Sequence, residues 1–175
     1  MSVKAKDVTV EYGDDINLDG YEVTSGSVYG TQPLNLGLFT TATKGSVVAR
    51  YDIDAAADLA ARNPNYYVTF AKGSVIINRR NITVTAEDKS SIYGDDLVAL
   101  DYLVEPGRLY GNDTLNVSLS TQARKGADAK TYSITKSATL DADNPNYNIH
   151  FVDGTYTINK RAVTVAANDV SATYG

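Results

Sequence analysis

The sequence lacks several residues on which common kinds of site depend. It has no cysteine and no tryptophan, and a single histidine among 175 residues. Without cysteine, the chain forms no disulfide and offers no thiolate nucleophile or thiolate metal ligand. With one histidine, His150, it lacks the residue combinations that frame nucleophilic catalysis. We therefore predict no catalytic residues, and we interpret His150 as a residue on the surface of a strand.

Long apolar runs and an excess of basic charge are also missing. No stretch approaches the roughly 18 apolar residues of a membrane span, so we expect no membrane insertion. Met1–Lys4 has no apolar signal region, so the signal of a secreted parent is expected upstream. The formal net charge is −5 with acidic and basic residues interspersed. Nucleic-acid binding requires a basic stripe, so we expect no nucleic-acid partner.

The residues that are present favour strands. Hydrophobic residues make up 43% of the chain, which suffices for a buried core. Thirteen tyrosines accompany many threonines, valines and isoleucines, the residue types enriched in β-sheets. Of only four prolines, two stand in the same tetrapeptide, Asn-Pro-Asn-Tyr, at 63–66 and at 144–147. The composition predicts a mostly-β fold, and the tetrapeptide indicates an internal repeat.

The repeat has a constant period of 81 residues. Asn63-Pro64-Asn65-Tyr66 and Tyr12-Gly13-Asp14-Asp15 both recur 81 residues later. By eye, about 40% of the aligned positions are identical, with no insertion. We therefore divide the chain into repeats at 1–79 and 80–160, followed by the opening strands of a truncated third at 161–175. Solenoid units are shorter, roughly 20 to 50 residues, so each repeat is expected to fold around its own core.

Alternating apolar residues predict six or seven short strands per repeat. Ile82, Val84 and Ala86 alternate with threonines, as expected of a strand with one buried face. Residues 55–62 suggest a helix, whereas their counterparts at 136–143 allow one turn at most. Lys72-Gly73 and Asp153-Gly154 suggest tight hairpin turns.

The boundary between the repeats is free of flexible residues. The segment 75–84 contains neither Gly nor Pro and no Ser-rich stretch. A flexible linker needs such residues. The sequence therefore predicts a short, stiff connection and an elongated pair of domains placed end to end.

The repeated motifs resemble the MBG/YDG-type modules of large bacterial adhesins. The similarity covers both repeats and the partial third. Its motifs in the second repeat are Tyr93-Gly94-Asp95, Tyr110-Gly111, Tyr132 with Ile134, Asn146-Tyr147, Gly154-Thr155 with Ile158, and Arg161 followed by Thr164-Val165-Ala166-Ala167. The resemblance implies β-grasp-like, mostly-β modules in tandem arrays at the bacterial cell surface, outside the cell. It implies no catalytic residues.

Three polar groups invite a chemical interpretation. Tyr-Gly-Asp-Asp presents adjacent carboxylates, but adjacent strand residues point to opposite faces and Gly-Asp is common in turns. The oxygen-rich residues at 141–146 offer ligands to calcium, although a solvated turn accounts for them better. Lys44 and Lys125, with Asn78 and Asn159, are the residue types of Lys–Asn isopeptide bonds, although exposed loop positions are expected for both lysines. We predict no metal and no cofactor.

The tyrosines form two groups. Five recur at the repeat period, and we interpret these as core residues or turn clamps, in preference to a platform for sugar stacking. The pairs are Tyr12/Tyr93, Tyr21/Tyr102, Tyr29/Tyr110, Tyr51/Tyr132 and Tyr66/Tyr147. Tyr67 and Tyr156 have no tyrosine counterpart, so we select these two as candidates for ligand contact at the surface.

Two functional hypotheses follow. In the first, the repeats are stalk or spacer modules of an extracellular bacterial adhesin, extend a distal binding region and catalyse no reaction. In the alternative, they form a carbohydrate- or matrix-binding module that contributes to adhesion or biofilm formation. The expected partners are neighbouring repeats of the same chain and, through the parent protein, a polysaccharide or host surface. We expect a monomer.

Overall fold

The computed structural model describes all residues from Met1 to Gly175. The chain forms two compact units, and the division passes through the second repeat. The first unit contains Met1–Val84, Val104–Val117 and Ala138–His150, and the second contains Thr85–Leu103, Ser118–Ser137 and Phe151–Gly175. The first repeat thus packs with part of the second. The repeat limits at 1–79, 80–160 and 161–175 stay predictions from the sequence.

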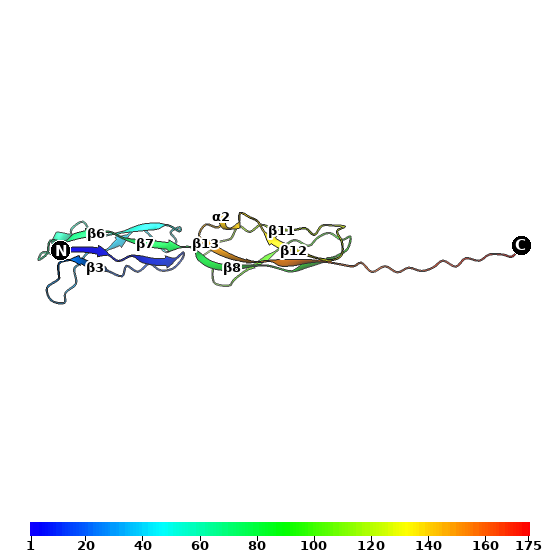
Figure 1. Ribbon diagram of the computed structural model, residues 1–175, viewed down its shortest axis with the longest axis horizontal. Helices are drawn as coiled ribbons and strands as arrows, with labels where there is room; N and C mark the ends of the chain where they lie inside the picture. The colour runs from blue at the N-terminus through cyan, green and yellow to red at the C-terminus, as the bar shows by residue number, and fades with distance from the viewer. The chain divides into compact units, whose positions relative to one another are not determined.

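The first repeat is built from two small sheets (Figure 1). Its elements are β1 (Ser2–Ala5), β2 (Val8–Glu11), β3 (Tyr21–Ser25), β4 (Phe39–Thr40), β5 (Arg50–Asp54), α1 (Leu59–Arg62), β6 (Thr69–Ala71) and β7 (Gly73–Asn78). One sheet has the order β3-β1-β6, with β1 antiparallel to β3 and parallel to β6. The other has the order β2-β7-β5-β4, with β2 parallel to β7 and the other pairs antiparallel.

The second repeat has the same plan. Its elements are β8 (Arg80–Ala86), β9 (Lys89–Ile92), β10 (Tyr102–Val104), β11 (Leu119–Thr121), β12 (Thr131–Lys136), α2 (Leu140–Asp143), β13 (Tyr147–Val152) and β14 (Gly154–Asn159). The sheets have the orders β10-β8-β13 and β11-β12-β14-β9. The mostly-β prediction is confirmed. The β-grasp-like arrangement stays a prediction, because each repeat consists of two small sheets with a single helical turn.

The chain changes sheets at Gly73 and Gly154, so the predicted hairpin turns are wrong. β6 pairs with β1, whereas β7 pairs with β2 and β5 in the other sheet. A Cβ atom on Gly73 would lie 2.5 Å from the carbonyl oxygen of Ala5, and one on Gly154 would lie 2.7 Å from that of Ala86. Glycine is needed here because two backbone segments cross closely, and not because of an unusual backbone angle.

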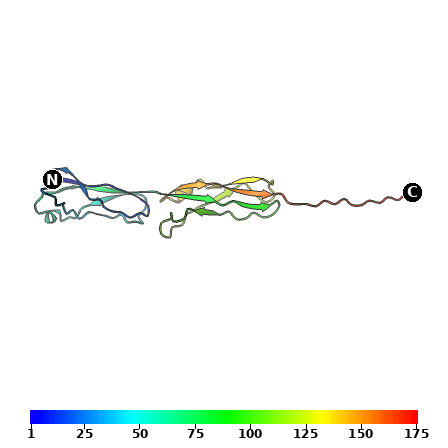
Figure 2. The same ribbon diagram turned by 90° about the horizontal axis from the view of Figure 1, so that it is seen from below.

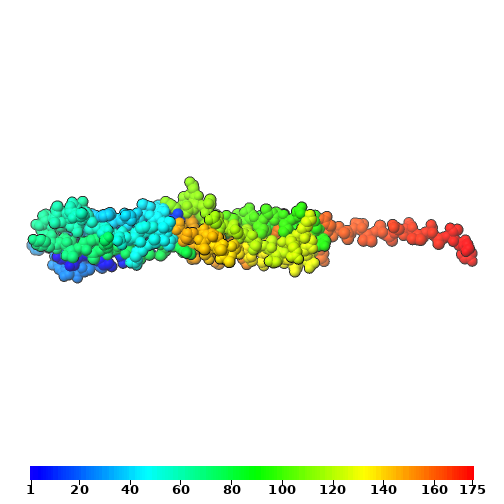
Figure 3. All heavy atoms as spheres, turned by 90° about the horizontal axis from the view of Figure 1, so that it is seen from above, coloured from blue at the N-terminus to red at the C-terminus, as the bar shows by residue number.

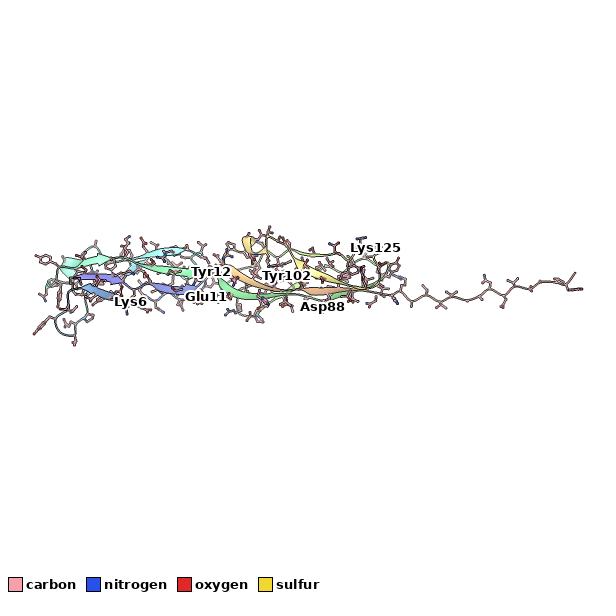
Figure 4. All side chains as sticks on the ribbon, in the orientation of Figure 1. Lys6, Glu11, Tyr12, Asp88, Tyr102 and Lys125 are labelled. Atoms are coloured by element: carbon pink, nitrogen blue, oxygen red, sulfur yellow. The ribbon has the colours of Figure 1, made fainter.

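An aspartate closes each crossing. The Asp7 carboxylate accepts a hydrogen bond from the backbone N–H of Ser74 at 2.8 Å. Asp88, labelled in Figure 4, accepts bonds from the backbone N–H and the hydroxyl of Thr155 at 2.7 and 2.8 Å. Each carboxylate provides a hydrogen-bond acceptor for the backbone N–H at the point where the chain passes from one sheet to the other.

The helical segments are single turns closed by a buried asparagine. The helix predicted for 55–62 is too long, because only Leu59–Arg62 is helical and the N–H of Ala56 bonds instead to the carbonyl oxygen of Leu36. The single turn allowed for 136–143 is confirmed at Leu140–Asp143. Asn63, 6% exposed, donates to the carbonyl oxygens of Asn35 and Leu59, each at 2.9 Å.

Each repeat has its own apolar cluster. In the first repeat, Val3, Leu34 and Leu36 are buried, and side chains such as Leu59 and Phe70 pack against them. In the second, the buried residues are Ala86, Ala123, Ile134, Tyr156 and Ile158. Because each repeat has its own core, duplication of the sequence adds a second module and does not enlarge the core of the first.

Residues 161–175 form no strand in this structure, and their assignment as the opening strands of a third repeat stays a prediction. Figure 2 shows this segment as an extended ribbon at the red C-terminal end of the chain, and Figure 3 shows the same segment as spheres. Val163 and Val165 are 80% and 89% exposed, whereas their counterparts Ile82 and Val84 are 2% and 0% exposed. The counterparts are buried because β8 lies between β10 and β13, and residues 161–175 contain no equivalent of those strands. No helix is long and apolar enough to cross a membrane.

Candidate functional site at the repeat junction

Only one residue separates the strands of the two repeats. β7 ends at Asn78 and β8 begins at Arg80, with Arg79 between them. The predicted short connection without Gly or Pro is therefore confirmed. The junction lies within the first compact unit.

Tyr12 of the first repeat is inserted between two tyrosines of the second. Its ring lies 5.4 Å from that of Tyr110 and 5.6 Å from that of Tyr147, centroid to centroid. The planes meet at 76° and 82°, the edge-to-face geometry that aromatic pairs favour. Tyr12 is only 6% exposed. We call this contact the tyrosine socket, and Figure 4 labels Tyr12 and the neighbouring Glu11.

The Tyr-Gly-Asp turn that carries Tyr12 also holds the linker. Arg80 donates through Nε to the carbonyl oxygen of Tyr12 at 2.6 Å, and its guanidinium pairs with the carboxylate of Asp14. The backbone N–H of Tyr12 bonds to Asn78 at 2.9 Å. The motif is therefore a structural turn, as predicted, and Asp14 is occupied by a cation of the same chain.

The same turn is present in the second repeat. Arg161 donates to the carbonyl oxygen of Tyr93 at 2.8 Å and pairs with Asp95. Gly13 and Gly94 have positive φ angles of 87° and 91°, which only glycine adopts without strain. The shape of the turn therefore does not depend on contact with a following repeat.

Polar contacts surround the tyrosine socket. The side chain of Asn81 donates to Glu11 at 3.0 Å, and its oxygen accepts a bond from Asn148 at 2.7 Å. Arg108 donates to the backbone carbonyl of Asn81 at 2.9 and 3.2 Å and lies 4.0 Å from Glu11. These exposed pairs contribute little stability individually, but they restrict the orientation of the second repeat on the first.

The hydroxyl of Tyr147 anchors the back of the socket. It donates to Asp113 at 2.7 Å and accepts a bond from the backbone N–H of Tyr110 at 3.0 Å. Burial raises the pKa of Tyr147 to about 12, and burial also raises the pKa of Tyr12. Both rings are therefore neutral at physiological pH.

The raised pKa makes the junction sensitive to alkali. Tyrosine in the unfolded chain ionises near pH 10, whereas folded Tyr147 keeps its proton up to about pH 12. This contribution to stability is complete below pH 10 and is lost as the pH rises toward 12. Tyr147→Phe has no proton to lose, so we expect its urea midpoint to fall less steeply across that interval. Tyr67→Phe, at an exposed site, is the control. Parallel profiles for wild type and Tyr147→Phe would contradict the assignment.

The recurring tyrosines divide according to their place in the repeat. Tyr21, Tyr51 and Tyr132 are half-buried clamps whose hydroxyls bond to the backbone of Leu34, Val47 and Asp128. Tyr29 is 94% exposed and Tyr93 is 45% exposed. Neither is a core residue, because each lacks the neighbouring ring that its counterpart contacts across the junction, and Tyr93 lies instead in the turn held by Arg161.

The two candidates for ligand contact differ. Tyr156 is fully buried, and its hydroxyl accepts a hydrogen bond from the N–H of Val98 at 2.7 Å. Its assignment to the surface is therefore wrong, because it fills the core of the second repeat. Tyr67 is 97% exposed, so it is available to a ligand, although its contact with one stays a prediction.

The other polar candidates have structural partners. Asn144 is 5% exposed and bonds to the backbone of Leu140 and Asn116, while Asp143 accepts a bond from Thr139. No group of three acidic, histidine or cysteine side chains is placed to hold a metal. Lys44 and Lys125 pair with Asp15 and Asp96 at 3.0 and 2.8 Å, not with asparagine, and His150 is exposed on β13.

Sequence reasoning missed two sets of residues. The sequence analysis assigned no role to Arg80 or Arg161, and it used Asn63 and Asn144 only as markers of the repeat. All four recur at the 81-residue period, which is the signal that could have identified them. Their roles depend on partners 28 and 68 positions away in the sequence.

Comparison with known proteins gives two similarities. Residues 82–157 match the family described as MBG domain (YGX type). The chain is also similar to a solved structure of a cell surface adhesin from Lactobacillus reuteri, with 25% sequence identity. That similarity covers 46% of this chain and 99% of the other, with a TM-score of 0.30. No curated protein matches the chain.

Proposed function

From the premise that residues 82–157 are a domain of the MBG family, we propose that the two repeats are spacer modules of an extracellular bacterial adhesin. In this role the modules hold a distal binding region away from the cell surface. The resemblance of both repeats to MBG/YDG-type modules supports the proposal. The role requires no reaction, no metal and no cofactor.

The observation that carries the proposal is the tyrosine socket with its one-residue linker. A spacer holds a distal binding region at a set distance from the cell only if successive modules keep a fixed orientation. Tyr12 is buried by two rings of the second repeat, and Arg80 ties the linker to the turn of the first. Aromatic pairs add about 0.5–1.5 kcal/mol each beyond the area that they bury. Such contacts oppose bending between modules.

The test measures the distance between the repeats with spin labels. The chain has no cysteine, so Thr24→Cys in β3 and His150→Cys in β13 give two unique, exposed sites. We expect one narrow distance distribution by double electron–electron resonance. A broad distribution in the unaltered junction would refute a stiff spacer.

Two glycines provide a matched pair of variants. Gly13→Ala and Gly94→Ala impose the same backbone strain, because both positions have φ near +90°. A Cβ on Gly13 would also lie 2.8 Å from the ring of Tyr110, whereas Gly94 has no aromatic neighbour within 4 Å. We expect Gly13→Ala to broaden the distribution and Gly94→Ala to leave it unchanged. Equal broadening would locate the effect in the turn and not in the socket.

The exposure of Tyr67 favours a second candidate, a carbohydrate- or matrix-binding module. A ring that is 97% exposed is free to stack on the apolar face of a sugar. A glycan array with the wild-type chain and with Tyr67→Ala tests this. Saturable binding that the substitution abolishes would support the second candidate, and absence of binding would exclude it for the probed glycans.

A further inference from the structure

An early strand and the last strand of each repeat lie side by side and run in the same direction. β2 pairs in parallel with β7, from Val8 opposite Val75 to Glu11 opposite Asn78. β9 pairs with β14 in the same way, at the positions 81 residues later in the sequence. In the other sheet of the first repeat, the early strand β1 is also parallel to the late strand β6. Parallel pairing of early with late strands is thus a constant feature of the fold.

Parallel pairing determines how such strands respond to tension. The chain enters β2 at its N-terminal end and leaves β7 at its C-terminal end, and in a parallel pair these two ends lie at opposite ends of the pair. Tension along the backbone therefore pulls the two strands past each other lengthwise. The hydrogen bonds between the strands run across this direction, so all of them are stretched together. In an antiparallel hairpin the two ends lie side by side, and tension breaks the bonds one after another.

Further hydrogen bonds close the pair at both ends. Before β2, the carboxylate of Asp7 accepts a bond from the backbone N–H of Ser74 at 2.8 Å. After β2, the backbone N–H of Tyr12 donates to the carbonyl oxygen of Asn78 at 2.9 Å. The second repeat has both bonds at the equivalent positions, Thr155 with Asp88 and Tyr93 with Asn159. The connection between the two strands therefore extends beyond the strands themselves.

Side-chain packing in the first repeat opposes the same movement. Val8 is 7% exposed, and Val75 and Ile77 of β7 are 0% and 3% exposed. Thr9, the next residue in β2, is exposed. Because side chains alternate between the two faces of a strand, a slip of β2 by one residue would turn Val8 toward solvent and Thr9 into the core. Movement of β2 along β7 thus breaks hydrogen bonds and apolar contacts at the same time.

We propose that the parallel pairs β2–β7 and β9–β14 are mechanical clamps, which keep each repeat folded when the chain is pulled along its backbone. This goes beyond the spacer role, because the tyrosine socket restricts the orientation between repeats, whereas the clamp resists unfolding within a repeat. The inference rests on the proposed function only for the source of the tension, which is a surface bound at the distal end of a chain attached to a cell.

The test is single-molecule force spectroscopy with two pulling geometries. The chain has no cysteine, so two introduced cysteines define the points of attachment. Lys6→Cys with Arg79→Cys pulls the β2–β7 pair from opposite ends, and Lys6→Cys with Lys72→Cys pulls it from one end. All three residues are exposed, and Figure 4 labels Lys6, which precedes β2. The first geometry slides the strands lengthwise, and the second peels them apart.

We expect a lower rate of unfolding at a given force in the lengthwise geometry. The difference is expected to be about tenfold or more, because several hydrogen bonds, each worth a factor of about five, must break together. Both pairs of cysteines enclose almost the same stretch of chain, so unfolding releases a similar length in both geometries. Equal rates, or a lower rate in the peeling geometry, would overturn the proposal. Circular dichroism of both double variants confirms that each is folded before it is pulled.

Two substitutions separate the clamp from the general stability of the repeat. Val8→Ala reduces packing within the clamp and is expected to raise the rate of unfolding under lengthwise tension by about tenfold. Leu36→Val is the control, because Leu36 is 3% exposed but lies outside both strands. We expect it to lower the urea midpoint and to change the rate under tension by less than about twofold.

The outcomes distinguish the clamp from the spacer. An unchanged rate for Val8→Ala, or an equal rise for Leu36→Val, would overturn the clamp. Repeats that unfold equally fast in both pulling geometries, with a narrow spin-label distribution, would overturn the clamp and leave the spacer supported. Repeats that resist lengthwise tension, with a broad spin-label distribution, would support the clamp and refute the stiff spacer.

Discussion

Tyr156→Ala is expected to lower the free energy of unfolding of the second repeat by about 3–5 kcal/mol, the cost of truncating a large buried aromatic residue. Tyr156 is the largest fully buried side chain, and it packs among Ala86, Ile134 and Ile158. Removal of its ring leaves a cavity in a small core, which has few neighbours able to fill it. A domain of this size is marginally stable, so the substitution threatens the fold of the repeat.

Tyr156→Phe removes only the hydroxyl, so it separates the contribution of the hydroxyl to stability from that of the ring. The hydroxyl accepts a bond from the N–H of Val98 at 2.7 Å, so its loss leaves that donor unpaired at a cost of about 1 kcal/mol. Urea unfolding followed by circular dichroism measures both variants. Tyr67→Ala, at an exposed site, is the control and is expected to change stability by less than about 0.5 kcal/mol. A Tyr156→Ala chain as stable as this control would contradict the burial of Tyr156.

The misassignment of Tyr156 shows what comparison of repeats leaves out. Absence of a tyrosine counterpart suggested a surface position, yet the counterpart is Val75, which is also fully buried. The two cores are filled by different residues at the same position of the last strand. The two repeats share a fold but fill their cores with different side chains. The absence of a tyrosine at the equivalent position of the other repeat therefore does not predict whether a tyrosine is exposed.

The strands could be predicted because alternation of apolar residues is a local signal. Ile82, Val84 and Ala86 are buried in β8 as their spacing predicts. The crossing at Gly73 could not be predicted in this way. A hairpin and a change of sheet both follow a glycine, and the pairing of β7 with β2 and β5 decides between them. That choice depends on residues far apart in the sequence.

The site was only partly predictable for a similar reason. Recurrence of Tyr12, Tyr110 and Tyr147 indicated that every module uses these positions, but not that one ring crosses into the next module. The single-residue linker was the stronger signal, because a segment without Gly or Pro restricts where the next repeat lies.

Tyr12→Ala is expected to reduce the stability of the chain by about 3 kcal/mol, whereas Tyr93→Ala is expected to cost about 1 kcal/mol. The two residues have the same turn and the same backbone bonds to a linker arginine. They differ in burial, since Tyr12 is 6% exposed and Tyr93 45%. The difference between the two losses therefore measures the packing of one repeat on the other, with the contribution of the turn removed.

Urea unfolding of both variants, followed by circular dichroism, gives this difference directly. Tyr12→Phe retains the edge-to-face contacts with Tyr110 and Tyr147 and is expected to recover most of the loss, because it removes only the hydroxyl, which bonds to Asp113 and Asn146. If Tyr12→Ala and Tyr93→Ala lower the free energy of unfolding by the same amount, Tyr12 stabilises only its own turn. The contact between the repeats then gains no stability from Tyr12. In that case two adjacent repeats would behave as independent domains on a short tether, and a stiff spacer would need another source of rigidity.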